Sequence, residues 1–194
     1  MTSIHDYKVI QSSTPEWEEI YAVAQQDTEH LLWENYQTIK LEEYDYMILY
    51  MNNNTPAGFH GIYNNGRWPD NVSRICNRAY LAPYYRKLGE GPEITSNNIK
   101  FVLDNYDQWG KDVLFISRGV QYDNVGITWR KFEKFCKFLE KTVEHSLVYD
   151  NYLYQCCSTE CKDCYQFCVW YDPKGLKNSL DINRITQEEW KLLT

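Results

Sequence analysis

The sequence predicts a mixed α/β fold: a central, mostly antiparallel sheet that includes one βαβ unit and is flanked by helices. The chain has 194 residues, of which 43% are hydrophobic and 24% charged, an ordinary composition for one domain with a full core. Apolar runs of strand length alternate along it with segments whose apolar residues recur at helical spacing. In the middle of the chain a strand, a helix and a further strand follow one another, which is the order of a βαβ unit.

The first elements expected are a strand at residues 6–13 and a helix at residues 13–26. Thr14 can cap this helix, and Pro15 suits its first position because the N–H that proline lacks would be unpaired there. The apolar face of the helix is expected to carry Trp17, Ile20, Tyr21 and Ala24. Residues 28–37 are expected to form a second helix.

The next segments predict a hairpin and then another strand. Residues 44–51 are an apolar run of strand length, and residues 57–66 form the second arm of the hairpin. Asn52–Asn54 lie between the arms and favour a turn, because asparagine tolerates a left-handed backbone. Residues 72–82 are expected to form the strand that follows.

A helix after Pro92, a strand at residues 111–120 and a helix at residues 127–143 are expected to complete the middle of the chain. The apolar face of the first of these helices should hold Ile99, Val102, Leu103 and Tyr106. The apolar face of the second should hold Trp129, Phe132, Cys136, Leu139 and Val143.

The C-terminal elements expected are a closing hairpin and a short helix. Residues 146–157 and 164–172 have the apolar content of two paired strands. Thr186 and Glu189 have the spacing of a capping box, in which each side chain bonds to the backbone N–H of the other residue. A short helix should therefore begin beside Thr186.

The charge and hydropathy of the chain exclude several classes of partner. The net charge of -7 speaks against a nucleic-acid-binding protein, which would present a basic face. No apolar run approaches the roughly 20 residues of a membrane span. Residues 1–10 lack the basic start and apolar core of a signal peptide. We therefore expect no nucleic acid and no membrane as partners, and a cytoplasmic location.

Most of the seven cysteines lie in one cluster near the C-terminus, namely Cys156, Cys157, Cys161, Cys164 and Cys168. In a cytosolic chain, cysteines occur as thiols or metal ligands more often than as disulfides. Cys161 and Cys164 form a C-x-x-C pair, which leaves a zinc site, a redox pair or packing thiols as interpretations. Structural zinc sites usually have two separated pairs, and because only one is present we expect no metal.

The stretch LAPYYRKLGEGPEI, residues 81–94, places basic residues and glycines just before an expected helix. Residues 86–91 would then lie at a helix N-terminus, where unpaired N–H groups and the helix dipole favour an anion. The two glycines let backbone N–H groups approach a phosphate, and Arg86 adds a full charge. Glu90 must then point outward. The alternative is an ordinary strand-to-helix turn, in which glycine is a default residue.

Residues 81–91 fit the pattern V-x-P-x-x-R-x-x-G-x-G, with leucine in place of the valine. In this pattern the chain resembles the GNAT-type N-acetyltransferases. The hairpin at residues 46–63, including Ala57–Gly58, is also similar to the second and third strands of that family. The expected order of elements matches the family over residues 6–171.

The resemblance implies a single GNAT-like, acyl-CoA-binding domain at residues 1–171 and a C-terminal extension with a short helix at residues 172–194. It also implies acetyl-CoA as the cosubstrate. The residues expected around the pyrophosphate are Arg86, Lys87, Leu88, Gly89, Glu90 and Gly91. The residues whose backbone is expected to pair with the pantetheine arm are Ala79, Tyr80, Leu81 and Ala82.

The reaction that the resemblance implies is direct attack of an amine on the thioester carbonyl, in a gap where the fourth and fifth strands part. A backbone N–H near Leu81 would stabilise the oxyanion, and a base or a water chain would take the ammonium proton. His60, on the third strand, is the candidate base because a histidine can titrate near neutrality, although a satisfied or solvent-facing histidine is the more ordinary interpretation. Asp123 and Glu43 are lesser candidates.

The departing thiolate should receive a proton, and family members often carry a tyrosine for this on the helix after the fifth strand. Phe132 or Leu139 occupies the corresponding position here, depending on the alignment. Asn124 could match an asparagine that often follows the fifth strand, and Tyr122 is a substitute proton donor. Coenzyme binding is thus better supported than catalysis. The alternative function is a non-catalytic GNAT-fold binding or interaction protein that keeps the coenzyme cleft.

The acceptor is expected to be a small-molecule amine or a protein amine. In this fold the acceptor is set by the first two helices and by hairpin loops such as residues 64–72, and these segments carry no motif that identifies it. The chain is expected to be a monomer or a homodimer.

Overall fold

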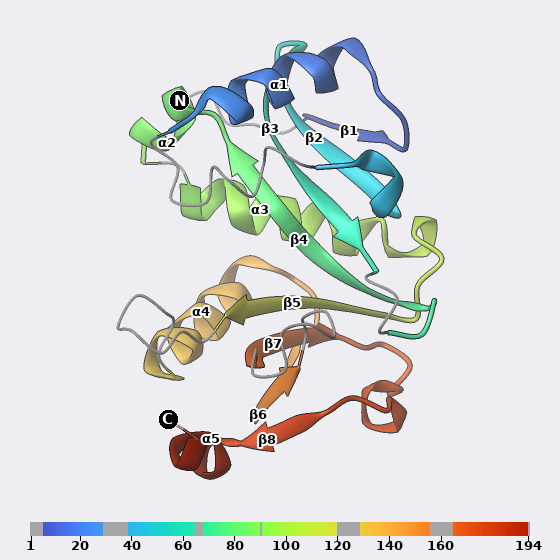
Figure 1. Ribbon diagram of the computed structural model, residues 1–194, viewed down its shortest axis with the longest axis vertical. Coiled ribbons are helices and arrows are strands. Elements are labelled where there is room, and N and C mark those ends of the chain that lie inside the picture. The colour runs from blue at the N-terminus through green and yellow to red at the C-terminus, as the bar shows by residue number, and fades with distance from the viewer. Residues whose placement is uncertain are drawn as a thin grey trace. The chain divides into compact units, whose positions relative to one another are not determined.

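The computed structural model describes residues 6–28, 39–64, 68–89, 91–119, 129–155 and 165–193 (Figure 1). The chain divides into two compact units, each with its own core. The first unit comprises residues 1–64 and 75–101, and the second comprises residues 65–74 and 102–194.

The elements follow the expected order, with short additions. In chain order they are β1 Asp6–Ile10, α1 Pro15–Gln26, β2 Tyr46–Asn52, β3 Thr55–Tyr63, β4 Val72–Leu81, α2 Pro83–Lys87, α3 Gly91–Asp104, β5 Val113–Gly119, α4 Trp129–Thr142, β6 Val148–Gln155, β7 Tyr165–Tyr171, β8 Arg184–Thr186 and α5 Gln187–Leu193. Two of these, α2 and β8, are additions to the elements that the sequence predicts. The helix expected at residues 28–37 lies almost wholly outside the described residues.

The strands form one sheet in the order β1-β2-β3-β4-β5-β7-β6-β8. The pairs β1/β2, β2/β3, β5/β7, β6/β7 and β6/β8 are antiparallel. β4 and β5 are parallel, with Val72–Arg74 paired to Val113–Phe115, and α3 lies between them in the chain. The predicted mixed, mostly antiparallel sheet with one βαβ unit is confirmed. The expected domain boundary at residue 171 stays a prediction.

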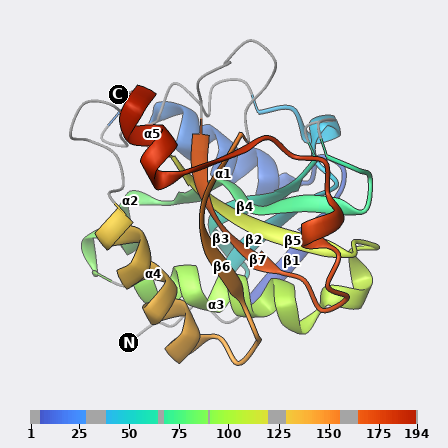
Figure 2. The ribbon, with the colours of Figure 1, turned by 90° about the horizontal axis from the view of Figure 1, so that it is seen from below.

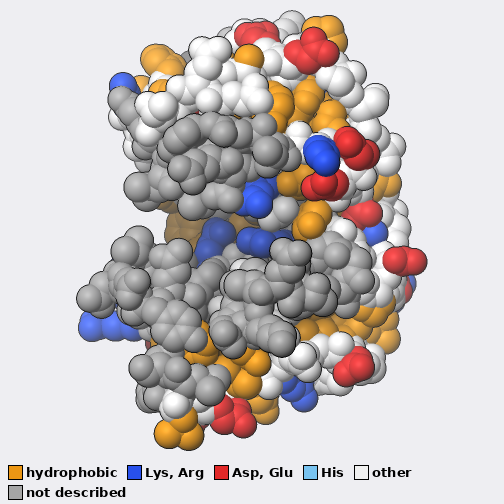
Figure 3. All heavy atoms as spheres, in the orientation of Figure 1, with side chains coloured by type: hydrophobic (Ala, Val, Ile, Leu, Met, Phe, Trp, Pro, Cys, Tyr) orange, Lys and Arg blue, Asp and Glu red, His pale blue; other side chains and the backbone are white. Residues whose placement is uncertain are grey.

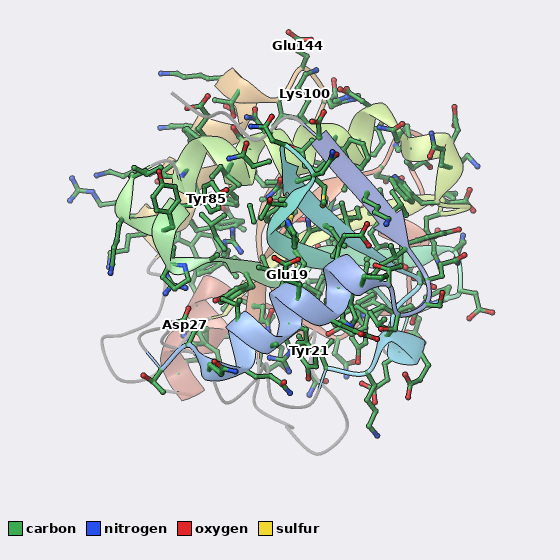
Figure 4. All side chains as sticks on the ribbon, turned by 90° about the horizontal axis from the view of Figure 1, so that it is seen from above. Glu19, Tyr21, Asp27, Tyr85, Lys100 and Glu144 are labelled. Carbon is green, nitrogen blue, oxygen red and sulfur yellow. The ribbon has the colours of Figure 1, made fainter. Side chains whose placement is uncertain are left out.

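In the first unit, α1 and α3 lie on opposite sides of the same strands, as Figures 2 and 4 both show. Successive residues of a strand point to opposite faces, and this alternation separates two clusters. Leu49 of β2 belongs to the cluster that contains Trp17 and Ile20 of α1. The next residue, Tyr50, belongs to the cluster that contains Ile94 of α3. The two-residue period of apolar side chains in the strands and the 3.6-residue period in the helices therefore determine this packing.

In the second unit, the core is built largely from aromatic rings. The ring of Trp170 on β7 lies 5.1 Å from that of Phe115 on β5 and 5.0 Å from that of Tyr154 on β6. On the other face of β7, Phe132 of α4 stacks on Phe167 with ring centroids 4.7 Å apart. The apolar stripe predicted for α4 is confirmed, since its central residues are buried.

Local capping and turn chemistry agrees with the sequence. The Thr14 side chain accepts a hydrogen bond from the Trp17 N–H at the start of α1. Asn53 and Asn54 both have positive φ in the β2–β3 turn. Thr186 and Glu189 form the expected capping box at α5: the Thr186 N–H donates to the Glu189 carboxylate, and the Glu189 N–H donates to the Thr186 hydroxyl.

The face seen in Figure 3 is mixed in character. Its acidic side chains are scattered singly or in small groups among the described residues. None of the helices in the described part of the chain is both long enough and apolar enough to span a membrane.

Candidate functional site

The connection from β4 to α3 begins with a helical turn. The sequence predicts a loop for residues 86–91, but α2 occupies Pro83–Lys87, so that prediction is corrected for its first two residues. The backbone N–H groups of Tyr85 and Arg86 both bond to the Ala82 carbonyl, at 3.0 and 3.3 Å. Proline at the first helical position favours this turn because it loses no hydrogen bond there.

The connection before α3 contains two glycines, Gly89 and Gly91. Gly89 has a φ of +73°, a left-handed conformation that glycine adopts without strain. Among the residues that the structure describes, a Cβ added to Gly89 or to Gly91 would meet no heavy atom within 4 Å. α3 is a helix of 14 residues that begins at Gly91, and the first N–H groups of a helix point out of its N-terminal end. This geometry can accept an anion. Glu90 lies outside the described residues.

Arg86 does not extend into this space. Its guanidinium lies 2.7 Å from the carboxylate of Asp27 and donates to the Leu81 carbonyl at 2.9 Å. The Asp27 side chain is 3% exposed, so the ion pair is largely buried. This arrangement differs from the expectation that Arg86 offers its full charge to a phosphate. The basic side chain that is exposed beside it is Lys87, and Leu88 is exposed as well.

The end of β4 lies close against β3. The Ala82 N–H donates to the Ala57 carbonyl at 2.9 Å. A Cβ at Gly58 would lie 2.3 Å from the Tyr80 carbonyl oxygen, so only glycine allows this approach of the two backbones. Among the residues expected to meet the pantetheine arm, Ala79 is exposed, Tyr80 is buried, and Leu81 and Ala82 are half-buried.

His60, the candidate base, is fully buried on β3. Its Nδ1 lies 2.9 Å from the Tyr50 hydroxyl, and its Nε2 has no hydrogen-bond partner in the part of the chain that the structure describes. Burial lowers the pKa of the imidazole from 6.5 to about 3, because the charged form loses its hydration. The expectation that His60 titrates near neutrality does not agree with this environment, and a neutral core histidine is the better interpretation.

The His60 ring should therefore remain neutral from pH 8 to about pH 5. Because its folded pKa lies below 6.5, the unfolded chain binds the proton first, and the resulting loss of stability grows as the pH falls from 6.5 toward 3. Histidine ring signals in NMR spectra, assigned by comparison with His60→Gln, should show no titration of this ring near neutrality. A midpoint between pH 6 and 7 would contradict the assignment and restore His60 as a base.

The other catalytic candidates are only partly described. Tyr122, Asp123 and Asn124 lie outside the described residues. Glu43 is exposed in a short 3₁₀ turn, 4.0 Å from Lys40. Phe132 and Leu139, the two alternative matches to the tyrosine expected from the resemblance, are 2% and 0% exposed and belong to the packed face of α4. Their burial means that they serve as core residues in this chain.

The cysteine cluster is mostly outside the described residues, since only Cys168 of its members is described. Cys168 is a buried thiol on β7, as are Cys76 on β4 and Cys136 on α4. Within the described ranges, no group of three or more His, Cys, Asp or Glu side chains could hold a metal ion. The expectation that the chain carries no metal stays a prediction.

Asp27 is the site residue that the sequence does not reveal. It is the C-cap residue of α1, and its carboxylate forms an ion pair with Arg86 and accepts a hydrogen bond from the Tyr80 hydroxyl. The only local signal is an acidic residue after a helix. Nothing in that signal predicts burial or a partner far along the chain.

Comparisons with known proteins support the fold and nothing finer. No family model matches the chain, and no curated protein matches it. The aminoglycoside 6'-N-acetyltransferase of Enterococcus faecium aligns with a TM-score of 0.51 at 10% identity, covering 86% of this chain and 96% of that one. A putative GNAT-family acetyltransferase of Desulfovibrio desulfuricans aligns with a TM-score of 0.50 at 11% identity, covering 86% and 99%. The chain therefore has a GNAT-type fold, as the sequence predicts.

Proposed function

We propose that this protein is an N-acetyltransferase that transfers the acetyl group of acetyl-CoA to an amine. The observation that carries the proposal is the glycine connection before α3, in which Gly89 is left-handed and a Cβ at Gly89 or Gly91 would meet no described atom within 4 Å. A GNAT-type fold with this feature at the end of β4 favours coenzyme A over other anions. Lys87 is exposed at the same connection and can add a positive charge.

In the proposed reaction, the nitrogen of the acceptor amine attacks the thioester carbonyl carbon. A C–N bond forms, the C–S bond breaks, and the electron pair leaves with the sulfur as a thiolate. The ammonium proton passes to a base or to water, and the thiolate takes up a proton. The pantetheine arm is proposed to lie along Ala79–Ala82, with a backbone N–H near Leu81 polarising the carbonyl. Holding both substrates side by side supplies much of the rate.

The test is calorimetric titration of coenzyme A into wild type, Gly91→Asp and Gly91→Ala. Both variants should fold, because the added Cβ meets open space and an acid in the first turn of a helix is favourable. Gly91→Asp should bind at least about 100-fold more weakly, since like charges about 4 Å apart repel by about 4 kcal/mol at an effective dielectric constant of 20. Gly91→Ala should bind within about threefold of wild type.

Equal binding by Gly91→Asp and wild type would show that the phosphates do not lie at α3. Failure of the wild type to bind coenzyme A at millimolar concentration would overturn the proposed function itself. The Gly91→Ala control separates the effect of charge from the effect of an added methyl group.

The second candidate function is a binding or interaction protein that keeps the coenzyme site without transfer. The observation that favours it is that Phe132 and Leu139 are apolar side chains packed in the core. Neither can supply the hydroxyl that family members often use. Release of free thiol from acetyl-CoA in the presence of a panel of small amines and peptide amines distinguishes the two functions. Coenzyme binding without thiol release would favour the second.

Tyr122 is our proposed substitute for that hydroxyl, and Asn124, two positions further along the chain, is the second candidate. Tyr122→Phe should lower turnover on the best amine by at least about tenfold, because general acid–base assistance is typically worth about 10²–10⁴-fold. Coenzyme affinity should stay the same. If the variant turns over as fast as wild type, water or the substrate protonates the thiolate instead.

The acceptor is proposed to be a small-molecule or protein amine, and the protein a monomer or a homodimer without nucleic-acid or membrane partners. A cytoplasmic location is also proposed. The buried thiols Cys76, Cys136 and Cys168 support it, because reducing compartments keep cysteines in this form.

A further inference from the structure

The connection between β4 and α3 is held by a network centred on Asp27. One Asp27 oxygen lies 2.7 Å from an Arg86 nitrogen and accepts a hydrogen bond from the Tyr80 hydroxyl at 2.8 Å. The same guanidinium donates to the Leu81 carbonyl and lies 5.8 Å from the centroid of the Tyr80 ring. Figure 4 shows Asp27 at the end of α1, so the network joins α1, β4 and α2.

Burial decides whether Arg86 can leave this network for a phosphate. The Asp27 side chain is 3% exposed and that of Arg86 is 26% exposed. Withdrawing Arg86 would remove a cation 2.7 Å from a buried carboxylate, and breaking one side of a buried ion pair is strongly destabilising. A phosphate that recruited Arg86 would have to compensate for this loss. Arg86 is therefore expected to remain on Asp27 when the coenzyme is bound.

The network acts on the glycine connection through α2. This helix has five residues, which is too few for a helix to be stable without tertiary contacts. The Arg86 carbonyl accepts a hydrogen bond from the Gly89 N–H at 3.2 Å. Fixing Arg86 therefore fixes the point at which the chain enters its left-handed turn. The buried Tyr85, whose hydroxyl accepts a hydrogen bond from Asn52, anchors the other side of α2.

We propose that Asp27 is a positioning residue for the coenzyme site, and that Arg86 acts as its clamp on α2 and not as a phosphate ligand. This inference rests on the proposed function for the identity of the ligand. Under it, the positive charge offered to the coenzyme phosphates comes from Lys87 and the start of α3. The paired charges of Asp27 and Arg86 cancel, and their contribution is geometric.

The test compares coenzyme A binding by wild type, Asp27→Asn, Arg86→Gln and the double variant, each at low and high salt. Each single variant should bind about tenfold more weakly, and the double variant should bind no more weakly than Arg86→Gln, since coupled residues are not additive. The double variant removes no net charge, so its salt dependence should equal that of wild type. Lys87→Gln is the matched control, and it should reduce the salt dependence.

In the competing interpretation, Arg86 binds the phosphate directly. It predicts a different change in coenzyme A affinity for one variant. Asp27→Asn would then release Arg86 to the ligand and bind coenzyme A as tightly as wild type or more tightly. That result would overturn the proposal, as would additive losses in the double variant. Tyr80→Phe keeps the ion pair and removes only one hydrogen bond to Asp27, so it should weaken binding by about threefold or less.

A measurement without ligand separates failure of this proposal from failure of the proposed function. Hydrogen exchange in the unliganded proteins should be faster at residues 83–89 in Asp27→Asn than in wild type, and unchanged in β7. This holds whether or not coenzyme A is the ligand. Unchanged exchange at residues 83–89 would overturn the clamp, and faster exchange across β7 as well would show general destabilisation and overturn a specific positioning role.

Discussion

Gly58→Ala should destabilise the protein by about 3 kcal/mol and weaken the proposed binding of coenzyme A, because the added methyl group has no room. Its Cβ would lie 2.3 Å from the Tyr80 carbonyl oxygen and 2.7 Å from the Tyr50 ring. A backbone oxygen inside a sheet cannot turn away as a side chain can, so β3 and β4 must separate. Overpacking of this kind costs about 1–3 kcal/mol, occasionally more.

The measurement is urea unfolding followed by circular dichroism, together with coenzyme A titration of the folded variant. Gly61→Ala on the same strand is the matched control. There the Cβ would meet the ring of Tyr44 at 2.2 Å, and this half-buried side chain can move. Gly61→Ala should therefore lose less stability than Gly58→Ala. Equal losses would show that the close approach of Gly58 to Tyr80 is not the cause.

Trp170→Ala should reduce the free energy of unfolding by about 3–5 kcal/mol, the usual range for removing a buried aromatic side chain. Trp170 is 0% exposed, and its ring meets those of Trp68, Phe115 and Tyr154 at centroid distances of 5.9, 5.1 and 5.0 Å. No neighbouring ring can fill the cavity without leaving its own contacts. Thermal and urea unfolding of the purified variant measure the loss.

Trp170→Phe is the control for this prediction. It keeps an aromatic ring in the cluster and removes the indole N–H, which is buried without a hydrogen-bond partner among the described residues. Removing a buried donor that lacks a partner is favourable, and this gain in free energy offsets part of the cost of the lost side-chain volume. Trp170→Phe should therefore be clearly more stable than Trp170→Ala. Equal stability of the two variants would show that the cavity does not dominate the cost.

Most of the secondary structure follows from local chemistry, and the sequence was sufficient for it. Thr14 and Pro15 begin α1, and Asn53 and Asn54 form the turn of the β2–β3 hairpin. The capping box of Thr186 and Glu189 begins α5. Each of these depends on residues within a few positions of one another. The periods of two and of 3.6 residues then place the apolar faces, and with the connection from β4 to β5 they define the fold class.

The glycine connection is a mixed case. Its place before a helix, and the need for glycine at residue 89, could be read from the sequence, since a left-handed residue there is a local matter. The helical turn α2 could not, because five residues form a helix only when other parts of the chain hold them. The short strand β8 is a similar case, since it forms by pairing with β6.

The roles of individual charged and titratable residues were decided by the tertiary structure alone. Arg86 has the same charge in any sequence context, but the buried carboxylate of Asp27 determines where that charge is directed. His60 has an ordinary pKa in water, but burial lowers it to about 3. Burial and ion pairing depend on residues far apart in the chain. Their contributions to the free energy are larger than those of the local conformational propensities. The sequence by itself thus determined the fold class and the place of the glycine turn that we propose as the anion site, while packing decided which side chains can act there.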